Sequence, residues 1–475
     1  MSLPAADLIS SSLRDDGLAV FNPATGEQIA AVADDGPDVA NAAIADADAA
    51  FKNWAGRTAR ERASVLRAWA SLLMSHAEEL AALATAECGK PLPEAKGEVF
   101  YAASFLEWFA EEGKRAYGDI VPSHQPNARI LVLKQPVGVS AAITPWNFPL
   151  AMITRKAGPA LAAGCPMVLK PAEATPLSAL ALEALAHQAG VPEAVFRVVT
   201  TADPKAVGEA FCDSGAVRKL SFTGSTRVGK LLAAQCASTV KRLSLELGGN
   251  APFIVFDDAD IDAAVAGAMG SKYRNAGQTC VCANRILVQA GVYDAFVEQL
   301  AERVSRLTVG NGADDGVQIG PLINQAGIGK VADLVDDALK SGASAVVGGG
   351  RHEAGELFFQ PTVLTGVSAE MRVAREEIFG PVAPIIRFET VDEALQLAND
   401  TPYGLAAYFY ARDMARIFKV LEGLDYGMVA ANEGVLSAES APFGGVKESG
   451  LGREGSKYGL DEYIELKYGL LGGLS

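Results

Sequence analysis

The sequence predicts an α/β protein with two domains, each built around a mostly parallel sheet. From about Val137, short apolar runs rich in β-branched residues alternate with amphipathic stretches, which is the pattern of βαβ units. At 475 residues the chain is also too long for a single hydrophobic core. The alternation falls into two series separated by Gly248 and Gly249, so we place the domain junction near residue 248.

Each predicted strand and helix follows from its local pattern. The strands of the first series are VGVSAAIT, PMVLK, VFRVV, RKLSF and KRLSLEL, and those of the second are PFIVF, RILVQ, SAVVG, VAPIIRF, LAAYFYA and YGMVAAN. Apolar residues three or four apart predict helices over residues 39–55, 59–87, 176–189 and 225–237. The segment EYIELKYG near the C-terminus predicts a last strand that pairs either with its own sheet or with another subunit.

Charge and cysteine content narrow the possible functions and surroundings. A net charge of −16 and a pI of about 4.9 argue against nucleic-acid binding, because phosphates need a basic surface. Six cysteines in so long a chain predict reduced thiols rather than a disulfide framework. The N-terminus lacks the pattern of a signal sequence, and prolines interrupt the most apolar stretch, residues 137–154. We therefore expect a cytoplasmic protein with no membrane span.

Cys280, in the segment GQTCVCANR, is the candidate nucleophile, although a lone intracellular cysteine is more often a buried small residue. The segment TPWNFP supplies Asn147, whose amide would form an oxyanion hole together with the Cys280 backbone N–H. The segment ELGGN places Glu246 at a strand end as a candidate general base. Each segment also has a purely structural alternative, a rigid turn for TPWNFP and an exposed carboxylate for Glu246.

Two segments at predicted strand ends are candidates for holding a nucleotide. KPAE (170–173) follows a strand, and ligands of α/β proteins bind at the carboxyl ends of parallel strands. FTGSTRVG opens a helix whose N-terminus favours a phosphate, and Gly224 and Gly229 allow close backbone approach. Two further segments, GNGADDG and DDADID, are interpreted as a surface loop and a helix N-terminus, so no metal site is predicted.

Together these segments resemble the NAD(P)-dependent aldehyde dehydrogenase superfamily over nearly the whole chain. The motifs occur in the family's order, namely TPWNFP, KPAE, FTGS, ELGGN, GQTC, EEIFGPV and PFGGVKESGLGRE. The resemblance implies a Rossmann-like cofactor domain (1–118 and 137–247), an α/β catalytic domain (248–445) and a small β oligomerisation element (119–136 and 460–475). It also implies a homodimer or a homotetramer.

The resemblance assigns roles to the matching residues. Cys280 would attack the aldehyde carbon, Asn147 would hold the oxyanion, and Glu246 would activate the water that hydrolyses the thioester. The residues implied to bind the cofactor are Trp146, Lys170, Glu173, Gly224, Ser225, Gly229, Leu247, Glu377 and Phe379. Lys156 and Glu454 match positions linked to proton relay.

The segments around the motifs are similar to those of the succinate-semialdehyde dehydrogenase subfamily. In that subfamily the residues matching Arg155, Arg274 and Ser437 bind the distal carboxylate of the substrate, and guanidinium groups pair well with carboxylates. Either arginine alone could instead be a surface charge or a structural ion pair. Glutarate semialdehyde differs by one methylene, worth only about 1–3 kcal/mol in a pocket. A glutarate-semialdehyde dehydrogenase or an aldehyde dehydrogenase of broader specificity therefore stays an alternative.

An enzyme of a different class, a cysteine hydrolase, could also use Cys280. Such an enzyme normally pairs its cysteine with a histidine, and none of the four histidines lies in a motif. This alternative is therefore disfavoured.

Two positions carry predictions about the cofactor and about regulation. The Glu173 carboxylate would bond an adenosine ribose and repel a 2′-phosphate, so we expect NAD, with NADP possible. Cys282 lies two residues after the nucleophile, and in some members of the subfamily such a pair is thought to form an inactivating disulfide. So short a spacing would require the loop to rearrange, and a packed small residue is the alternative.

Overall fold

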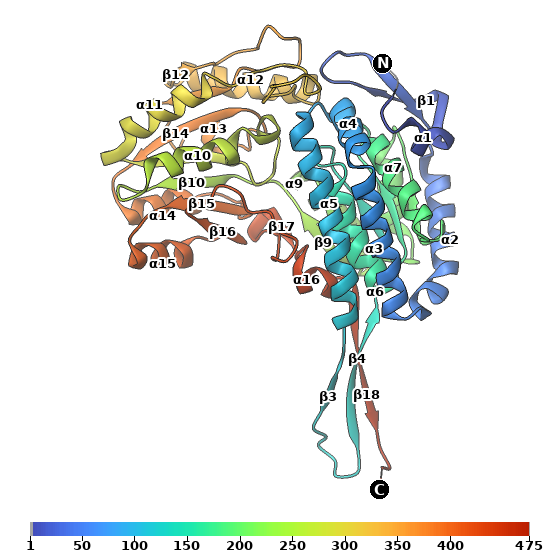
Figure 1. Cartoon of the computed structure of the whole chain (residues 1–475). Coiled ribbons are helices and arrows are strands. Elements are labelled where there is room, and N and C mark those ends of the chain that lie inside the picture. The colour runs from blue at the N-terminus through green and yellow to red at the C-terminus, as the bar shows by residue number, and fades with distance from the viewer. Residues whose placement is uncertain (1–2, 475) are drawn as a thin grey trace.

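The computed structural model describes residues 3–474 and shows two α/β lobes with a narrow β arm (Figure 1). The first lobe lies on the right of the view, the second on the left, and the arm projects below the first lobe. The chain crosses between the lobes at residues 247–250, which join the sheet of the first lobe to that of the second. The predicted α/β class with mostly parallel sheets is confirmed.

Six strands form the sheet of the first lobe, in the order β17-β9-β8-β5-β6-β7. They are β5 (Val139–Ile143), β6 (Met167–Lys170), β7 (Phe196–Val198), β8 (Val217–Thr223), β9 (Arg242–Glu246) and β17 (Gly450–Leu451). Only β17 runs antiparallel to its neighbour. The parallel strands are largely buried because apolar helices cover both faces of the sheet.

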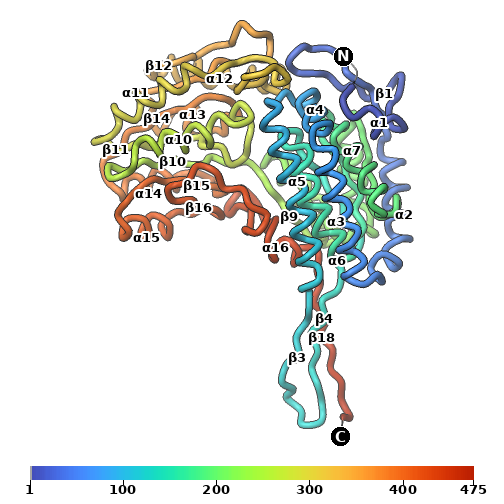
Figure 2. The backbone as a smooth tube through the Cα atoms, in the orientation of Figure 1, coloured from blue at the N-terminus to red at the C-terminus, as the bar shows by residue number. Residues whose placement is uncertain are grey.

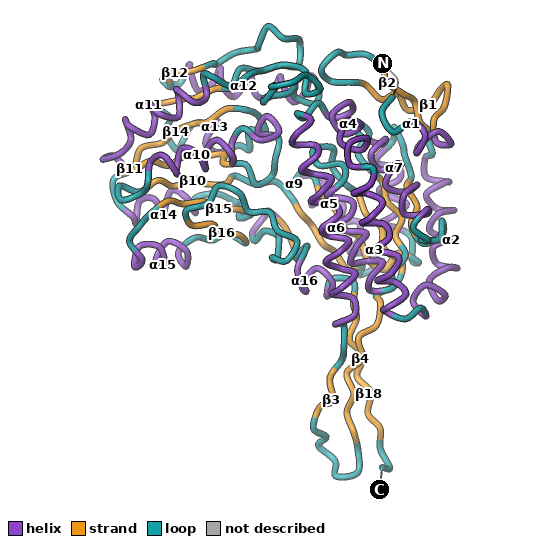
Figure 3. The backbone as a smooth tube through the Cα atoms, viewed as in Figure 1, coloured by secondary structure: helices purple, strands orange, loops and turns teal. Residues whose placement is uncertain are grey.

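Helices surround this sheet (Figure 3). They are α2 (Gly36–Gly56), α3 (Ala59–Ser75), α4 (Ala77–Cys88), α5 (Leu92–Glu112), α6 (Ala151–Ala163), α7 (Pro176–Gln188), α8 (Pro204–Asp213) and α9 (Thr226–Cys236). The single helix predicted over 59–87 is wrong, because the chain breaks at His76 into α3 and α4. The His76 ring bonds to Glu79 at 3.0 Å and so stabilises the turn between the two helices.

The N-terminal segment contains elements that the sequence analysis did not predict. A short helix α1 (Ala6–Ile9) precedes an antiparallel hairpin of β1 (Leu13–Phe21) and β2 (Gln28–Val32). Most residues of β1 are half-buried or exposed in the structure. The strand's sequence therefore lacks the apolar run that marks the central strands.

Seven strands form the sheet of the second lobe, in the order β12-β13-β14-β11-β10-β15-β16. They are β10 (Ala251–Val255), β11 (Ala283–Gln289), β12 (Ser344–Val347), β13 (Thr362–Thr365), β14 (Val382–Phe388), β15 (Ala406–Tyr410) and β16 (Met428–Ala431). The accompanying helices are α10 (Ile261–Lys272), α11 (Tyr293–Val304), α12 (Gln325–Lys340), α13 (Arg372–Arg375), α14 (Val391–Asn399) and α15 (Met414–Gly423). The short helix α16 (Ser456–Asp461) instead packs on α5 and α6 of the first lobe, near the arm. Strand β13 was not predicted, although β6, β12 and β16, which are equally short, were.

The arm consists of three antiparallel strands, β3 (Asp119–Val121), β4 (Arg129–Pro136) and β18 (Ile464–Leu471), in the order β18-β4-β3. The last strand pairs with β4 of its own chain along its whole length, so one of the two predicted pairings is observed. Figure 2 shows the C-terminus at the tip of the arm, far from both lobes. The outer edge of β18 has no pairing strand among residues 3–474.

Candidate active site

Cys280 lies between the 3-10 turn Arg274–Gly277 and strand β11. Two residues of that turn, Asn275 and Ala276, have φ values of 50° and 54°, in the left-handed region that side chains disfavour. Such strain persists only where the surroundings hold it. The Asn275 N–H donates to the Glu94 carboxylate at 2.7 Å, which fixes the turn against α5. Cys280 is thus presented by a loop with a defined, strained shape.

Asn147 lies in the loop between β5 and α6, and hydrogen bonds tie this loop to the Cys280 loop. Its side-chain Nδ2 donates to the Gln278 carbonyl at 2.9 Å. Its own carbonyl accepts from Lys90 at 2.7 Å and from the Asn275 amide at 3.1 Å. Since an amide nitrogen has two protons, one N–H of Asn147 remains to donate to another acceptor.

Glu246 ends strand β9 and is buried, and its Oε2 has no hydrogen-bond partner among the described residues. Burial raises the pKa of Glu246 well above its usual range, and the neighbouring Glu454 raises it further. Arg155 and Lys156 act in the opposite direction. A carboxylate with a raised pKa is suited to accept a proton near neutral pH.

The pKa of the Cys280 thiol depends on burial and on nearby charged side chains. Burial raises the pKa of the Cys280 thiol to about 12, and Arg155 opposes that rise. The carboxylates of Glu246 and Glu377 raise it further, so both act on the thiol. The thiol is therefore protonated at neutral pH in this structure, and it has to give its proton to a base before it can act as a nucleophile.

Arg155 is buried in α6, and only part of its guanidinium is engaged by neighbouring residues. Its Nε donates to Glu454, and its Cζ lies 4.1 Å from the centre of the Phe443 ring. Its Nη2 is buried without a hydrogen-bond partner within residues 3–474. Because a buried, unpaired guanidinium nitrogen is costly, this nitrogen is suited to an anionic ligand.

Arg274, Ser437 and Arg155 converge on one side chain, Tyr101 of α5. Burial raises the pKa of the Tyr101 hydroxyl, while Arg155, Ser437 and Arg274 lower it. The Arg274 guanidinium also lies over Phe148, with 5.5 Å between Cζ and the ring centre. The three residues predicted to bind a substrate carboxylate thus all influence the same buried hydroxyl, although they lie far apart in the sequence.

Tyr101 is not among the residues predicted from the sequence. It packs against Phe105 one helical turn later, with ring centres 4.7 Å apart. In the sequence this spacing is typical of the apolar face of a helix, so nothing distinguishes Tyr101 from a core residue. Only the approach of two arginines in space marks it as part of a site.

The candidate cofactor residues of the first lobe lie at the carboxyl ends of its strands. Lys170, the last residue of β6, is buried and paired with Glu173. Ser225 caps α9, and its hydroxyl accepts from the third N–H of the helix at 3.4 Å. A Cβ on Gly229 would lie 2.4 Å from the side chain of Leu247, so glycine here lets α9 pack against Leu247 without displacing that side chain. The N–H of Gly224 donates to the Glu246 carbonyl at 3.0 Å.

The second lobe contributes Glu377 and Phe379. The Glu377 Oε1 accepts from the Gly249 N–H at 2.9 Å, and Phe379 packs edge to face on Trp146 with ring centres 5.6 Å apart. These residues fit a dinucleotide. The start of α9 offers N–H groups for a phosphate, while Lys170, Glu173 and Glu377 offer polar groups for ribose hydroxyls.

Cys282 is buried, and its sulfur lies 3.6 Å from the carbonyl oxygens of Lys272 and Ala283. Cys280 and Cys282 are both free thiols in the structure. The regulatory disulfide between them stays a prediction.

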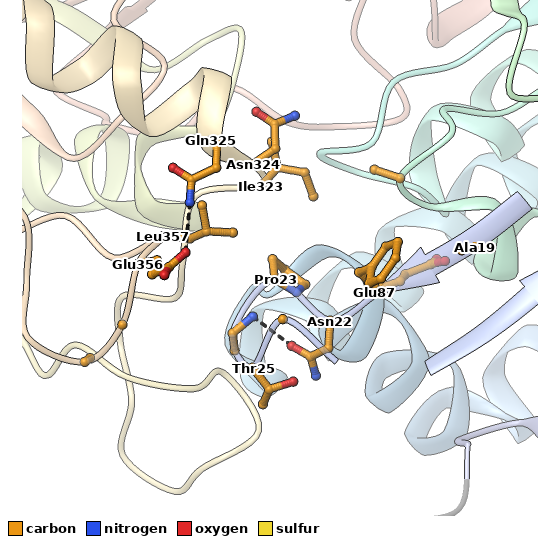
Figure 4. Close-up of a pocket in the computed structure, with 16 residues that line it drawn as sticks. Ala19, Asn22, Pro23, Thr25, Glu87, Ile323, Asn324, Gln325, Glu356 and Leu357 are labelled. Atoms are coloured by element: carbon orange, nitrogen blue, oxygen red, sulfur yellow. Dashed lines mark hydrogen bonds between the residues drawn. The ribbon is translucent and has the colours of Figure 1, made fainter. Parts of the chain in front are cut away.

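A separate cavity of about 710 Å³ lies between the β1–β2 turn (22–26) and two segments of the second lobe, 323–325 and 354–357 (Figure 4). Gln325 donates to Glu356 at 3.2 Å on its second-lobe side. The residues that line this cavity include none of the candidate site residues described above. Glu87 also lines the cavity. Its carboxylate accepts hydrogen bonds from the N–H groups of Leu177 and Ser178 and so caps the N-terminus of α7.

The described part of the chain has neither a metal-binding cluster nor a helix that could span a membrane. Residues 3–474 contain no cluster of three or more His, Cys, Asp or Glu side chains arranged to hold a metal ion. Within the same residues, every helix is too short or too polar to cross a membrane.

Comparisons with known proteins give consistent results. The model of the aldehyde dehydrogenase family matches residues 9–468. The chain is 59% identical to a succinate-semialdehyde dehydrogenase of Escherichia coli whose name specifies NADP, over 96% of this chain and 95% of that protein. It is 58% identical to a glutarate-semialdehyde dehydrogenase of Pseudomonas aeruginosa, over 96% and 94%. A crystal structure of succinate-semialdehyde dehydrogenase from Burkholderia pseudomallei superposes with a TM-score of 0.95 at 59% identity, covering 96% of this chain and 95% of that one.

Proposed function

The chain belongs to the aldehyde dehydrogenase family, and we propose that it oxidises succinic semialdehyde to succinate with Cys280 as nucleophile. The observation that carries the choice of substrate is the buried Nη2 of Arg155, which lacks a partner among the described residues. Arg274 lies near the same position, and both arginines act on Tyr101. Two guanidinium groups close to the nucleophile favour an aldehyde with a carboxylate at its far end.

The reaction begins at Cys280. Its proton goes to Glu246, and the resulting thiolate adds to the aldehyde carbon. The free N–H of Asn147 and the Cys280 backbone N–H donate to the oxygen, which gains negative charge as the bond forms. A nicotinamide cofactor, when bound, would accept the hydride that leaves the former aldehyde carbon, and Cys280 would then hold the acyl group as a thioester.

Hydrolysis of the thioester uses Glu246 a second time. Once Glu246 has passed on the thiol proton, its carboxylate takes a proton from water as the water oxygen adds to the thioester carbon. The C–S bond then breaks, and the thiolate that leaves takes the proton of the carboxylic acid product. The burial of Glu246 supports this role, because the raised pKa makes its carboxylate a stronger base. Lys156 and Glu454, which form a buried ion pair close to Glu246, are the first groups that can take the proton on from it.

For the cofactor, members of the family use NAD(P), and we propose that this enzyme prefers NAD. The Glu173 carboxylate lies where the adenosine ribose is expected, and a 2′-phosphate would meet its negative charge. The pairing of Glu173 with Lys170 holds the carboxylate at that place. Replacing Glu173 with serine (Glu173→Ser) should raise kcat/KM for NADP relative to NAD by about tenfold, since removing one like-charge contact is worth roughly 1–2 kcal/mol. A ratio unchanged by the substitution would contradict this assignment.

Glutarate semialdehyde is the second candidate substrate, and the 58% identical Pseudomonas relative bears that name. A single assay series decides among the candidates. Reduction of NAD and NADP is followed at 340 nm with succinic semialdehyde, glutaric semialdehyde and butanal. We expect the largest kcat/KM for succinic semialdehyde. Equal kcat/KM values for all three aldehydes would contradict the proposal that the site binds a carboxylate. Hydrolysis of a thioester or an ester without any cofactor reduction would instead favour a cysteine hydrolase.

We further propose a homodimer or homotetramer held together through the arm and working in the cytoplasm. Apolar side chains on the arm support the assembly, because Ile120, Leu466 and Tyr468 are more than half exposed in the single chain. Free thiols at all six cysteines support a reducing environment.

A further inference from the structure

A stripe of buried polar side chains runs along one face of strands β8 and β9. Because side chains alternate along a strand, every second residue lies on the same face, and the register pairs Thr223 with Glu246 and Ser221 with Ser244. We name as the polar stripe the residues Glu246, Thr223, Ser221, Ser244 and Lys219. All five are buried, whereas the opposite face of the same strands contributes Leu220, Phe222 and Leu245 to an apolar core.

The stripe starts at the proposed base and ends near solvent. At the first end, the Glu246 Oε2 and the hydroxyl of its cross-strand neighbour Thr223 both lack hydrogen-bond partners among the described residues. At the other end, Lys219 donates to Ser244, and the Ser244 hydroxyl donates to Glu462 at 2.9 Å. The Glu462 side chain is 20% exposed, so it can exchange protons with water.

The middle of the stripe is connected to the ion pair beside the base. The Lys156 Nζ is paired with Glu454 and lies 3.1 Å from the Ser221 hydroxyl. Ser221 and Ser244 lie on neighbouring strands, about 4.8 Å apart in backbone spacing, a distance that one bridging water spans.

We propose that the polar stripe conducts the proton that Glu246 takes from water in each turnover to Glu462 and so to solvent. This rests on the proposed function, because only a reaction that protonates a buried base needs such a route. After the water oxygen has added to the thioester carbon and the C–S bond has broken, Glu246 holds the proton taken from water. The stripe returns Glu246 to its carboxylate form by passing one proton to Glu462, and no electrons move.

The charges around Lys219 suit it to accept and release a proton. Burial lowers the pKa of Lys219 to about 8, while Glu462 acts in the opposite direction. Arg242 and Lys156 lower it further, and the Tyr463 ring centre lies 4.8 Å from its Nζ. An amine that titrates close to neutral pH can take a proton from one side and give it to a carboxylate on the other.

The test separates hydride transfer from proton release in the complete enzyme. Stopped-flow absorbance follows NADH, while a pH-indicator dye in weak buffer follows released protons. In the Lys219→Met and Glu462→Gln variants we expect an NADH burst within about twofold of wild type, with proton release and steady-state turnover slowed about tenfold or more. Added imidazole, a small proton acceptor, should restore much of the lost turnover.

Lys241→Met is the matched control, because Lys241 is also buried but donates only to the Ser214 and Val217 carbonyls. It should leave proton release in step with NADH. Turnover within about twofold of wild type in both test variants would overturn the proposal, as would equal losses of burst and turnover. Absence of NADH formation from any aldehyde in the wild type would instead overturn the proposed function.

Discussion

Arg274 and Arg155 differ in what else depends on them. Arg155 holds Glu454, so its removal also disturbs the buried pair of Glu454 with Lys156. Arg274 is half-buried and forms no ion pair with any described residue. Substitution of Arg274 therefore reports on substrate binding with less disturbance of the proton-handling groups.

We predict that Arg274→Ala lowers kcat/KM for succinic semialdehyde by about ten- to hundredfold, because a charge-assisted hydrogen bond is worth roughly 1.5–3 kcal/mol. The value for butanal, which has no carboxylate, should change by less than about threefold. Arg412→Ala, at an exposed arginine of the second lobe, serves as the control and should change neither value. Parallel losses on both aldehydes would show that Arg274 does not recognise the carboxylate.

Glu246 leads to a prediction about pH. Burial and Glu454 raise its pKa, and a protonated Glu246 cannot accept a proton from water. Thioester hydrolysis should therefore speed up as pH rises through this raised pKa, above the usual carboxylate value of about 4.3. Single-turnover measurement of acyl-enzyme decay checks this. The Glu246→Gln variant should lose the rising limb and accumulate the thioester, whereas an unchanged profile would exclude Glu246 as the base.

At the scale of elements, the start of α6 depends on the buried pair of Lys90 with Glu98. The Glu98 Oε1 accepts the N–H groups of Leu150 and Ala151 at 2.8 and 3.1 Å, and Lys90 donates to the Asn147 carbonyl. One ion pair thus stabilises both the first turn of the helix and the loop that carries the oxyanion-hole candidate.

We predict that Glu98→Ala destabilises the enzyme by about 3–5 kcal/mol, because it leaves a buried lysine without its partner. Urea denaturation followed by tryptophan fluorescence measures this. Glu111→Ala, which removes an exposed carboxylate paired with Arg67 and Lys114, should cost less than about 1 kcal/mol. Similar losses in the two variants would mean that the buried pair has no special role.

Most strands of the two sheets were predictable because their apolar runs are continuous and bounded by turn residues, whereas β13 and the two-residue β17 were not predicted. Asn147, Glu246 and Cys280 could be proposed from the sequence because they stand in motifs next to those strands, and their catalytic roles stay predictions. The break at His76 and the role of Tyr101 were not predictable. The break at His76 depends on a change of direction between α3 and α4. The position of Tyr101 near Arg155 of α6 and Arg274 of the Cys280 loop depends on how distant segments pack together.

At the scale of the whole molecule, the arm is the part whose shape has no explanation within one chain. It projects away from both lobes, and the outer edge of β18 has no partner strand among residues 3–474 (Figures 1 and 2). Leu466 on that strand is 68% exposed. An apolar, unpaired edge of this length is a template for association, which natural monomers avoid.

We therefore predict that Leu466→Lys shifts the enzyme toward smaller assemblies. Each interface between two copies would lose two buried leucines, worth at least about 3 kcal/mol together, or about a hundredfold in the dissociation constant. Size-exclusion chromatography with light scattering over a dilution series measures the mass. The control is Phe418→Lys on α15, an equally conspicuous exposed apolar residue outside the arm, which should leave the mass unchanged. If Leu466→Lys keeps the wild-type mass at every dilution while Phe418→Lys lowers it, the copies associate through the second lobe and not through the arm.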